Sequence, residues 1–124
     1  MEFVERISGE KALDIFRRLK EEYRPLRILV LGLDYDRLTI VTGVEIQDGR
    51  PFLLVDHPWG FEETVPEPEG RRVRLEFKDK KLIPHSCQTV ISHVADRDLW
   101  LESPVFVERT QRRRHFRVEP PQGT

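Results

Sequence analysis

The sequence predicts a mainly β protein: a small, closed or nearly closed antiparallel β-barrel preceded by one amphipathic helix. Apolar residues recur at helical spacing in one place, between residues 12 and 23. Six or so short stretches after it suit strands and are separated by turn signals, which is typical of small barrels. Helices and strands do not alternate along the chain, so a doubly wound α/β fold is not expected.

The helix is expected to begin after Ser8, whose hydroxyl can accept hydrogen bonds from the first free amides. Pro25 restricts the residue before it and ends the helix. Charged side chains occupy most of the other side of an apolar stripe made of Ala12, Ile15, Phe16, Leu19 and Tyr23. A single stripe indicates a surface helix that covers part of a sheet.

The first strands are expected at residues 26–31 and 38–46, separated by a turn at 34–36. Residues 38–46 alternate between two faces, as a long strand does. Asp48-Gly49 is a tight-turn signal, so a strand at residues 52–55 should pair back antiparallel. This hairpin is the clearest local prediction in the chain.

A proline- and glutamate-rich loop is expected at residues 56–70. Its aromatic residues, Trp59 and Phe61, could form an exposed contact for a partner, but folding back over one end of the barrel is favoured. Further strands are expected at residues 72–78, 84–94 and 99–101, and residues 105–107 lead into an arginine-rich stretch.

Composition narrows the classes of function. Charged residues make up 35% of the 124 residues but cancel to a net charge of −1, which favours a small anionic ligand over a nucleic-acid polymer. The single cysteine, Cys87, excludes an internal disulfide and suits a reducing, cytoplasmic environment. The sequence offers neither a membrane-length apolar run nor a secretory signal.

Metal and catalytic sites are weakly supported. His85, Cys87 and His93 could in principle supply three metal ligands from one strand, but a half-buried thiol beside surface imidazoles is the favoured interpretation. Neither a nucleophile elbow nor a glycine-rich phosphate loop occurs. We therefore expect a protein that is not an enzyme and that has no metal or cofactor.

The arginine-rich stretch is the most distinctive feature of the sequence. It puts five arginines within nine residues, and the guanidinium group can grip phosphate or a guanine edge with two hydrogen bonds. Arg113 and Arg117 are four apart, so they would share a face of a helical turn or could curl around a small polyanion in an extended linker. A solvated basic run that pairs with the domain's own acids is an equally open interpretation. The arginines are Arg109, Arg112, Arg113, Arg114 and Arg117.

Residues 104–120 resemble the interdomain junction of bacterial flagellar brake proteins of the YcgR type. In that family an N-terminal barrel passes through a "QRR-x-x-FRV-x-P" linker into a PilZ domain, and Gln111 to Pro120 match this pattern. Arg113-x-x-x-Arg117 matches the RxxxR half of the PilZ motif for cyclic di-GMP. Upstream, the helix and the runs at residues 51–58 and 73–77 also fit, so the resemblance covers most of the chain, although only the linker motif is specific.

The resemblance implies a PilZ-like split barrel at residues 1–107 and an interdomain linker at residues 108–124 that begins a PilZ domain. It also implies a non-catalytic regulatory role in a cyclic di-GMP effector that controls flagellar motility. Arg113 and Arg117 would grip the dinucleotide, with Arg112 assisting, while Phe116 and Val118 anchor the far side of the linker. Flagellar motor proteins are candidate partners, and membrane insertion is not expected.

The second half of the PilZ motif, D/N-x-S-x-x-G, does not follow the linker in this chain. The chain therefore looks like part of a longer protein or a natural truncation, and it should bind cyclic di-GMP weakly by itself. Two alternatives belong to other classes. The arginine tail could dock on an acidic protein partner, or it could bind RNA or DNA electrostatically.

Overall fold

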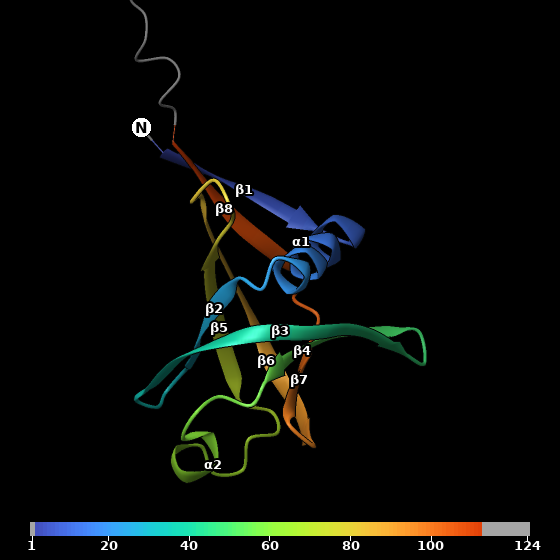
Figure 1. Cartoon of the computed structure of the whole chain (residues 1–124), viewed down its shortest axis with the longest axis vertical. Helices are drawn as coiled ribbons and strands as arrows, with labels where there is room; N and C mark the ends of the chain where they lie inside the picture. Colours follow the sequence, from blue (N-terminus) through green and yellow to red (C-terminus); the bar gives the residue numbers. More distant parts are fainter. Residues whose placement is uncertain (1, 113–124) are drawn as a thin grey trace, which may run out of the picture.

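Six antiparallel strands close into a barrel in the computed structural model, which describes residues 2–112 (Figure 1). Around the barrel each strand pairs with the next, and the last pairs with the first, in the order β2-β3-β4-β7-β6-β5. The fold class expected from the sequence is confirmed. The six strands are β2 (Pro25–Val30), β3 (Tyr35–Gln47), β4 (Arg50–Asp56), β5 (Arg72–Lys78), β6 (Pro84–Ala95) and β7 (Asp98–Glu102).

Two long strands allow the barrel to close. The first part of β3 pairs with β2 and its second part with β4, and the register shifts between Val41 and Gly43. In the same way β6 pairs first with β5 and then with β7, with a shift between Ile91 and His93. An extra residue in one strand bends it and increases its twist. Each irregularity therefore lies where its strand passes from one neighbour to the next.

The predicted hairpin between β3 and β4 is confirmed. Gln47 pairs with Arg50, so the turn has two residues, and both have positive φ angles: 52° at Asp48 and 77° at Gly49. A turn of this kind has the twist that antiparallel strands require. Asp and Gly tolerate that backbone conformation well.

Helix α1 (Glu10–Glu21) packs against the barrel through Ala12, Phe16 and Leu19 of the predicted apolar stripe. Tyr23, which was also predicted to belong to the stripe, lies beyond the end of the helix and is 80% exposed. Phe16 is fully buried, and its ring centre lies 5.7 Å from that of Phe77 in β5. Leu13, which was not part of that prediction, is buried as well, whereas Ile15 of the predicted stripe is only half-buried. The predicted Ser8 cap is wrong: Gly9 precedes the helix with φ of 65°, and no side chain caps the first turn.

Strand β1 (Glu2–Ser8) was not predicted from the sequence. It pairs along its whole length with β8 (Phe106–Arg112), from Glu2 opposite Arg112 to Ser8 opposite Phe106. These two strands form a ribbon, which we call the β1–β8 ribbon, and Figure 1 shows it extending away from the barrel beside α1. Residues 108–112, expected to begin the linker, therefore lie in a paired strand.

The loop between β4 and β5 contains one helical turn, α2 (Phe61–Thr64), at the opposite end of the molecule from the ribbon (Figure 1). Phe61 is buried against Tyr35, as expected for a residue that folds back over the barrel. Trp59 does not follow that expectation, because 80% of its side chain is exposed. The guanidinium group of Arg37 lies 5.5 Å from the centre of the Trp59 ring.

Candidate functional site

The β1–β8 ribbon carries the chain toward the predicted binding residues. Strand β8 pairs with β6 at two positions, Glu108 with Ser86 and Arg109 with His85, and beyond them it pairs with β1 alone. Its outer half lies beside the β5–β6 turn, by which we mean residues 79–83 (Figure 1). The candidate site is therefore the place where the end of β8 meets this turn.

Of the three arginines predicted to bind the ligand, the structure places Arg112. It is the last residue of β8, and its backbone pairs with Glu2. Arg113 and Arg117 lie outside the described residues. The structure thus fixes the point from which the predicted linker continues, and the roles of all three side chains stay predictions.

Arg109, the first arginine of the run, is engaged within the ribbon. Its Nε and Nη2 atoms donate hydrogen bonds to one oxygen of Glu5, at 3.1 and 2.5 Å, and Gln111 donates to the same oxygen at 3.2 Å. These hydrogen bonds to Arg109 and Gln111 hold the pKa of Glu5 below its ordinary value. Arg109 therefore stabilises the β1–β8 pairing. For this one arginine, the alternative in which the basic run pairs with the domain's own acidic residues is correct.

His85 in β6 pairs with Arg109, at the point where the outer half of β8 begins. The side chain is 5% exposed, and its ring stacks on Phe77 with centres 5.0 Å apart. Its Nδ1 lies 2.9 Å from the carbonyl oxygen of Ile83, which can only accept, so Nδ1 carries the proton. Burial lowers the pKa of His85, so the neutral ring is favoured. These contacts give His85 a packing role.

The three residues considered as possible metal ligands, His85, Cys87 and His93, do not have the surroundings that the sequence suggested. Cys87 is buried, not half-buried, and His85 is a core residue, not a surface imidazole. Both side chains point inward because residues two apart on a strand share a face. His93 stacks on Trp100 instead, with ring centres 5.0 Å apart. Within residues 2–112 no group of three His, Cys, Asp or Glu side chains is placed to hold a metal ion.

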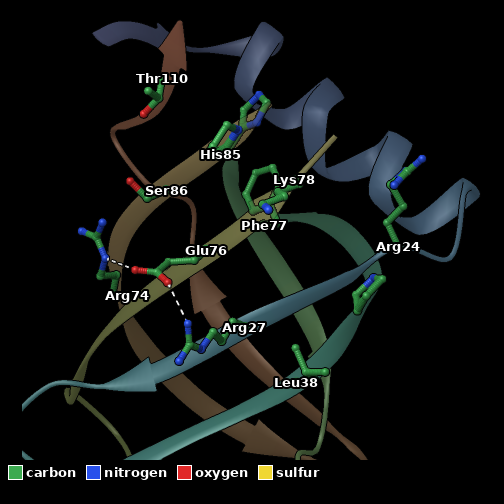
Figure 2. Close-up of a pocket in the computed structure, with 12 residues that line it drawn as sticks. Arg24, Arg27, Leu38, Arg74, Glu76, Phe77, Lys78, His85, Ser86 and Thr110 are labelled. Atoms are coloured by element: carbon green, nitrogen blue, oxygen red, sulfur yellow. Dashed lines mark hydrogen bonds and ion pairs between the residues drawn. The ribbon is translucent and has the colours of Figure 1, made fainter. Parts of the chain in front are cut away.

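A hollow of about 550 Å³ opens on the outside of β2, β5 and β6 and reaches Thr110 in β8 (Figure 2). Its arginines are already paired. Arg74 donates to Glu76 at 2.7 Å, and Arg27 lies 3.5 Å from the same carboxylate (Figure 2). Arg27 also donates two hydrogen bonds to Asp36, at 2.7 and 2.6 Å. The arginines that line this hollow are therefore compensated, whereas Lys78, which lines it at the end of β5, has no ion-pair partner among residues 2–112.

Two further hollows flank the β5–β6 turn. One, of about 480 Å³, is lined by Lys78, Lys81, Thr110 and Gln111 among others. The other, of about 500 Å³, lies between α1 and the turn and is lined in part by Lys80, Lys81 and Gln111. From the sequence, residues 79–81 were interpreted only as a turn. Three lysines within four residues, at 78, 80 and 81, were the signal that could have identified a basic surface there.

The exposed lysines give this end of the molecule chemical groups that suit an anion. Lysine ammonium groups and backbone amides can compensate phosphate charge. The one buried thiol nearby, Cys87, is not activated, because burial raises its pKa to about 12. In residues 2–112, moreover, no helix has the length and apolar character needed to cross a membrane.

The closed six-stranded barrel, its N-terminal helix and its two-stranded extension define a small PilZ-like barrel of the kind found in YcgR-type proteins. A comparison with solved structures matches YcgR from Escherichia coli, determined in complex with c-di-GMP, with a TM-score of 0.66. The match covers 88% of this chain and 47% of that one, at 14% sequence identity. The YcgR-type fold expected from the sequence is thereby confirmed.

This chain corresponds to about half the length of that YcgR chain. No protein-family model matches the sequence, and a comparison with curated proteins gives no match either. The shared fold with YcgR is therefore the finding on which a functional proposal can build.

Proposed function

We propose that this chain is the non-catalytic N-terminal regulatory domain of a cyclic di-GMP effector of the PilZ class. One combination supports the proposal: a barrel that shares the fold of YcgR over 88% of the chain, with an RxxxR sequence directly after its last strand. The proposed barrel domain comprises residues 1–107. Residues 108–124 form the proposed linker to a PilZ domain.

In this proposal the arginines after β8 supply half of the dinucleotide site. Arg113 and Arg117 grip the phosphates and guanine faces, and Arg112 assists from the end of the strand. Guanidinium suits this ligand because its planar fork donates paired hydrogen bonds and also stacks on rings. The other half of the site is contributed by the PilZ domain.

The proposed output is a change in the arrangement of two domains. A ligand can shift that arrangement only if it contacts the alternative states unequally. Capture of cyclic di-GMP between the linker and the PilZ domain would provide this difference. We propose that the protein acts in the cytoplasm and that the reoriented domains meet flagellar motor components, which would make control of motility the result.

The test is calorimetric titration of cyclic di-GMP into a protein that carries this chain together with the proposed PilZ domain, which we call the full-length protein, and into its Arg113→Lys/Arg117→Lys variant. Lysine keeps the charge but loses the fork, so we expect at least about a tenfold loss of affinity per arginine. Arg97→Lys is the matched control, since Arg97 is an exposed arginine in the turn between β6 and β7. Its affinity should equal that of the unchanged protein.

Unchanged affinity in the double variant would contradict the proposed roles of Arg113 and Arg117. The alternative functions predict another pattern. An acidic partner or nucleic acid bound electrostatically should tolerate lysine, so binding to single-stranded DNA would weaken only slightly and would depend steeply on salt. Such binding without any affinity for cyclic di-GMP would favour the alternatives.

A further inference from the structure

The end of β5 and the β5–β6 turn together carry a group of exposed positive charges. Lys78, Lys80 and Lys81 are all exposed. None of them takes part in an ion pair with another residue in the range 2–112. The nearby Arg74 and Arg109, in contrast, are paired with Glu76 and Glu5. These lysines are thus available to an external anion, as is the exposed Arg18, which lines the hollow between α1 and the turn.

Hydrogen bonds to Asp79 hold the backbone of the turn, including that of Lys81, in a defined conformation. One oxygen of Asp79 accepts hydrogen bonds from the backbone amides of Lys81, at 2.8 Å, and Ile83, at 3.0 Å. The amide of Leu82 also donates to the carbonyl of Asp79 at 2.8 Å. Asp79 is therefore used to close the turn. A turn fixed in this way limits the entropy that its residues lose when a ligand binds.

The turn and the end of β8 face the same space. Lys78 and Lys81 line the 480 Å³ hollow together with Thr110 and Gln111. A volume of this size is in the range of small-molecule sites. Arg113 is two peptide bonds beyond Gln111 in the sequence. In the proposed function the linker arginines therefore follow directly after a strand whose end lines the same hollow as these lysines.

We propose that Lys78 and Lys81 are the barrel's own contribution to the dinucleotide site, where their ammonium groups bind a phosphate of cyclic di-GMP. This inference rests on the proposed function and adds a third surface to it. A dinucleotide with two phosphates can be gripped by the linker arginines and can contact the barrel at the same time. The ligand then fixes the linker against the barrel as well as against the PilZ domain. That contact is one source of the unequal interaction that a conformational response needs.

The experiment compares two double variants of the full-length protein, each of which removes two positive charges. Lys78→Ala/Lys81→Ala changes the proposed site. Lys11→Ala/Lys20→Ala is the matched control, because both lysines are exposed on α1 and line none of the hollows described above. Cyclic di-GMP is titrated calorimetrically at about 50 and about 200 mM salt, a range over which the screening length changes appreciably.

We expect the site variant to bind about tenfold more weakly and with a smaller salt dependence, while the control stays within about twofold of the unchanged protein. A site variant that binds like the control would overturn the inference and leave the proposed function standing. If binding is lost only in the Arg113→Lys/Arg117→Lys variant, the inference about the lysines is likewise overturned and the proposed function stands. If the unchanged full-length protein does not bind cyclic di-GMP, both the proposed function and this inference fail.

Discussion

At the scale of single residues, Cys87 shows how the barrel interior controls chemistry. The thiol is 4% exposed, and burial raises its pKa to about 12, with Arg74 opposing the shift weakly. The thiolate is disfavoured because it would lose water without gaining a close cationic partner. Since the thiolate is the reactive form, Cys87 should be chemically inert while the domain is folded.

We predict that Cys87 reacts with a thiol reagent such as DTNB at pH 8 at least about a hundredfold more slowly in the folded protein than in urea. The release of the coloured product measures both rates. An exposed thiol at the neighbouring position, in the Cys87→Ala/Gln88→Cys variant, is the control and should react rapidly. Equal rates for Cys87 in the two conditions would contradict its burial.

The same pKa shift has a consequence for stability at high pH. The unfolded thiol ionises near its ordinary pKa of 9.0, while the folded thiol keeps its proton up to about 12. Between these values the folded state binds more protons, so the free energy of unfolding falls as the pH rises. Below about pH 9 both states carry the proton, and Cys87 adds no pH dependence.

The arginine run shows what residue patterns can and cannot predict. The sequence identified the run, but not that Arg109 would be paired with Glu5, which is 104 positions away. That contact depends on the pairing of β1 with β8, which no local pattern encodes. The two lysines that we propose as binding residues, Lys78 and Lys81, were missed for a related reason. They become candidates only once β8 is known to lie beside the β5–β6 turn.

At the scale of elements, α1 is held by its buried stripe and lacks a side-chain cap. Phe16 is fully buried, and its ring lies against Phe77. We predict that Phe16→Ala lowers the free energy of unfolding by about 3–5 kcal/mol, since truncation removes buried area and leaves a cavity. Urea denaturation followed by circular dichroism measures the change.

Ile15→Ala is the control for this prediction. Ile15 belongs to the same helix but is only partly buried. Its truncation should therefore cost less, about 1–2 kcal/mol. If the two variants lose the same stability, Phe16 is not the main anchor of α1.

The elements that could be predicted from the sequence are those whose signal lies within a few neighbouring residues. Apolar and charged residues alternate at 72–78, and Asp48-Gly49 favours a two-residue turn, so β5 and the hairpin of β3 and β4 were predicted. Strand β1 was not, because Glu2–Ser8 mixes charges with apolar residues and its partner lies about a hundred residues away. Ser8 was mistaken for a helix cap. It is instead the last residue of β1, and Gly9, with φ of 65°, makes the change of direction into α1.

At the scale of the whole molecule, the barrel and the ribbon have separate roles. The barrel strands supply most of the buried core, to which α1 adds Phe16, and their closed ring leaves no free edge. The ribbon extends from it and brings the end of β8 to the basic β5–β6 turn (Figure 1). A domain with a net charge of −1 can therefore present a local positive surface where the proposed linker begins.

Our last prediction concerns the 124-residue chain alone. A ligand as small as cyclic di-GMP gains affinity from contacts that converge on it, and in the proposed function the PilZ domain supplies half of them. Binding by this chain would still have to offset the entropy lost when the linker is ordered. We therefore expect weak or undetectable binding in isothermal titration at moderate salt, and much tighter binding by the full-length protein. Submicromolar affinity of the chain alone would mean that the barrel and its arginines already form a complete site, and the shared-site proposal would then be wrong.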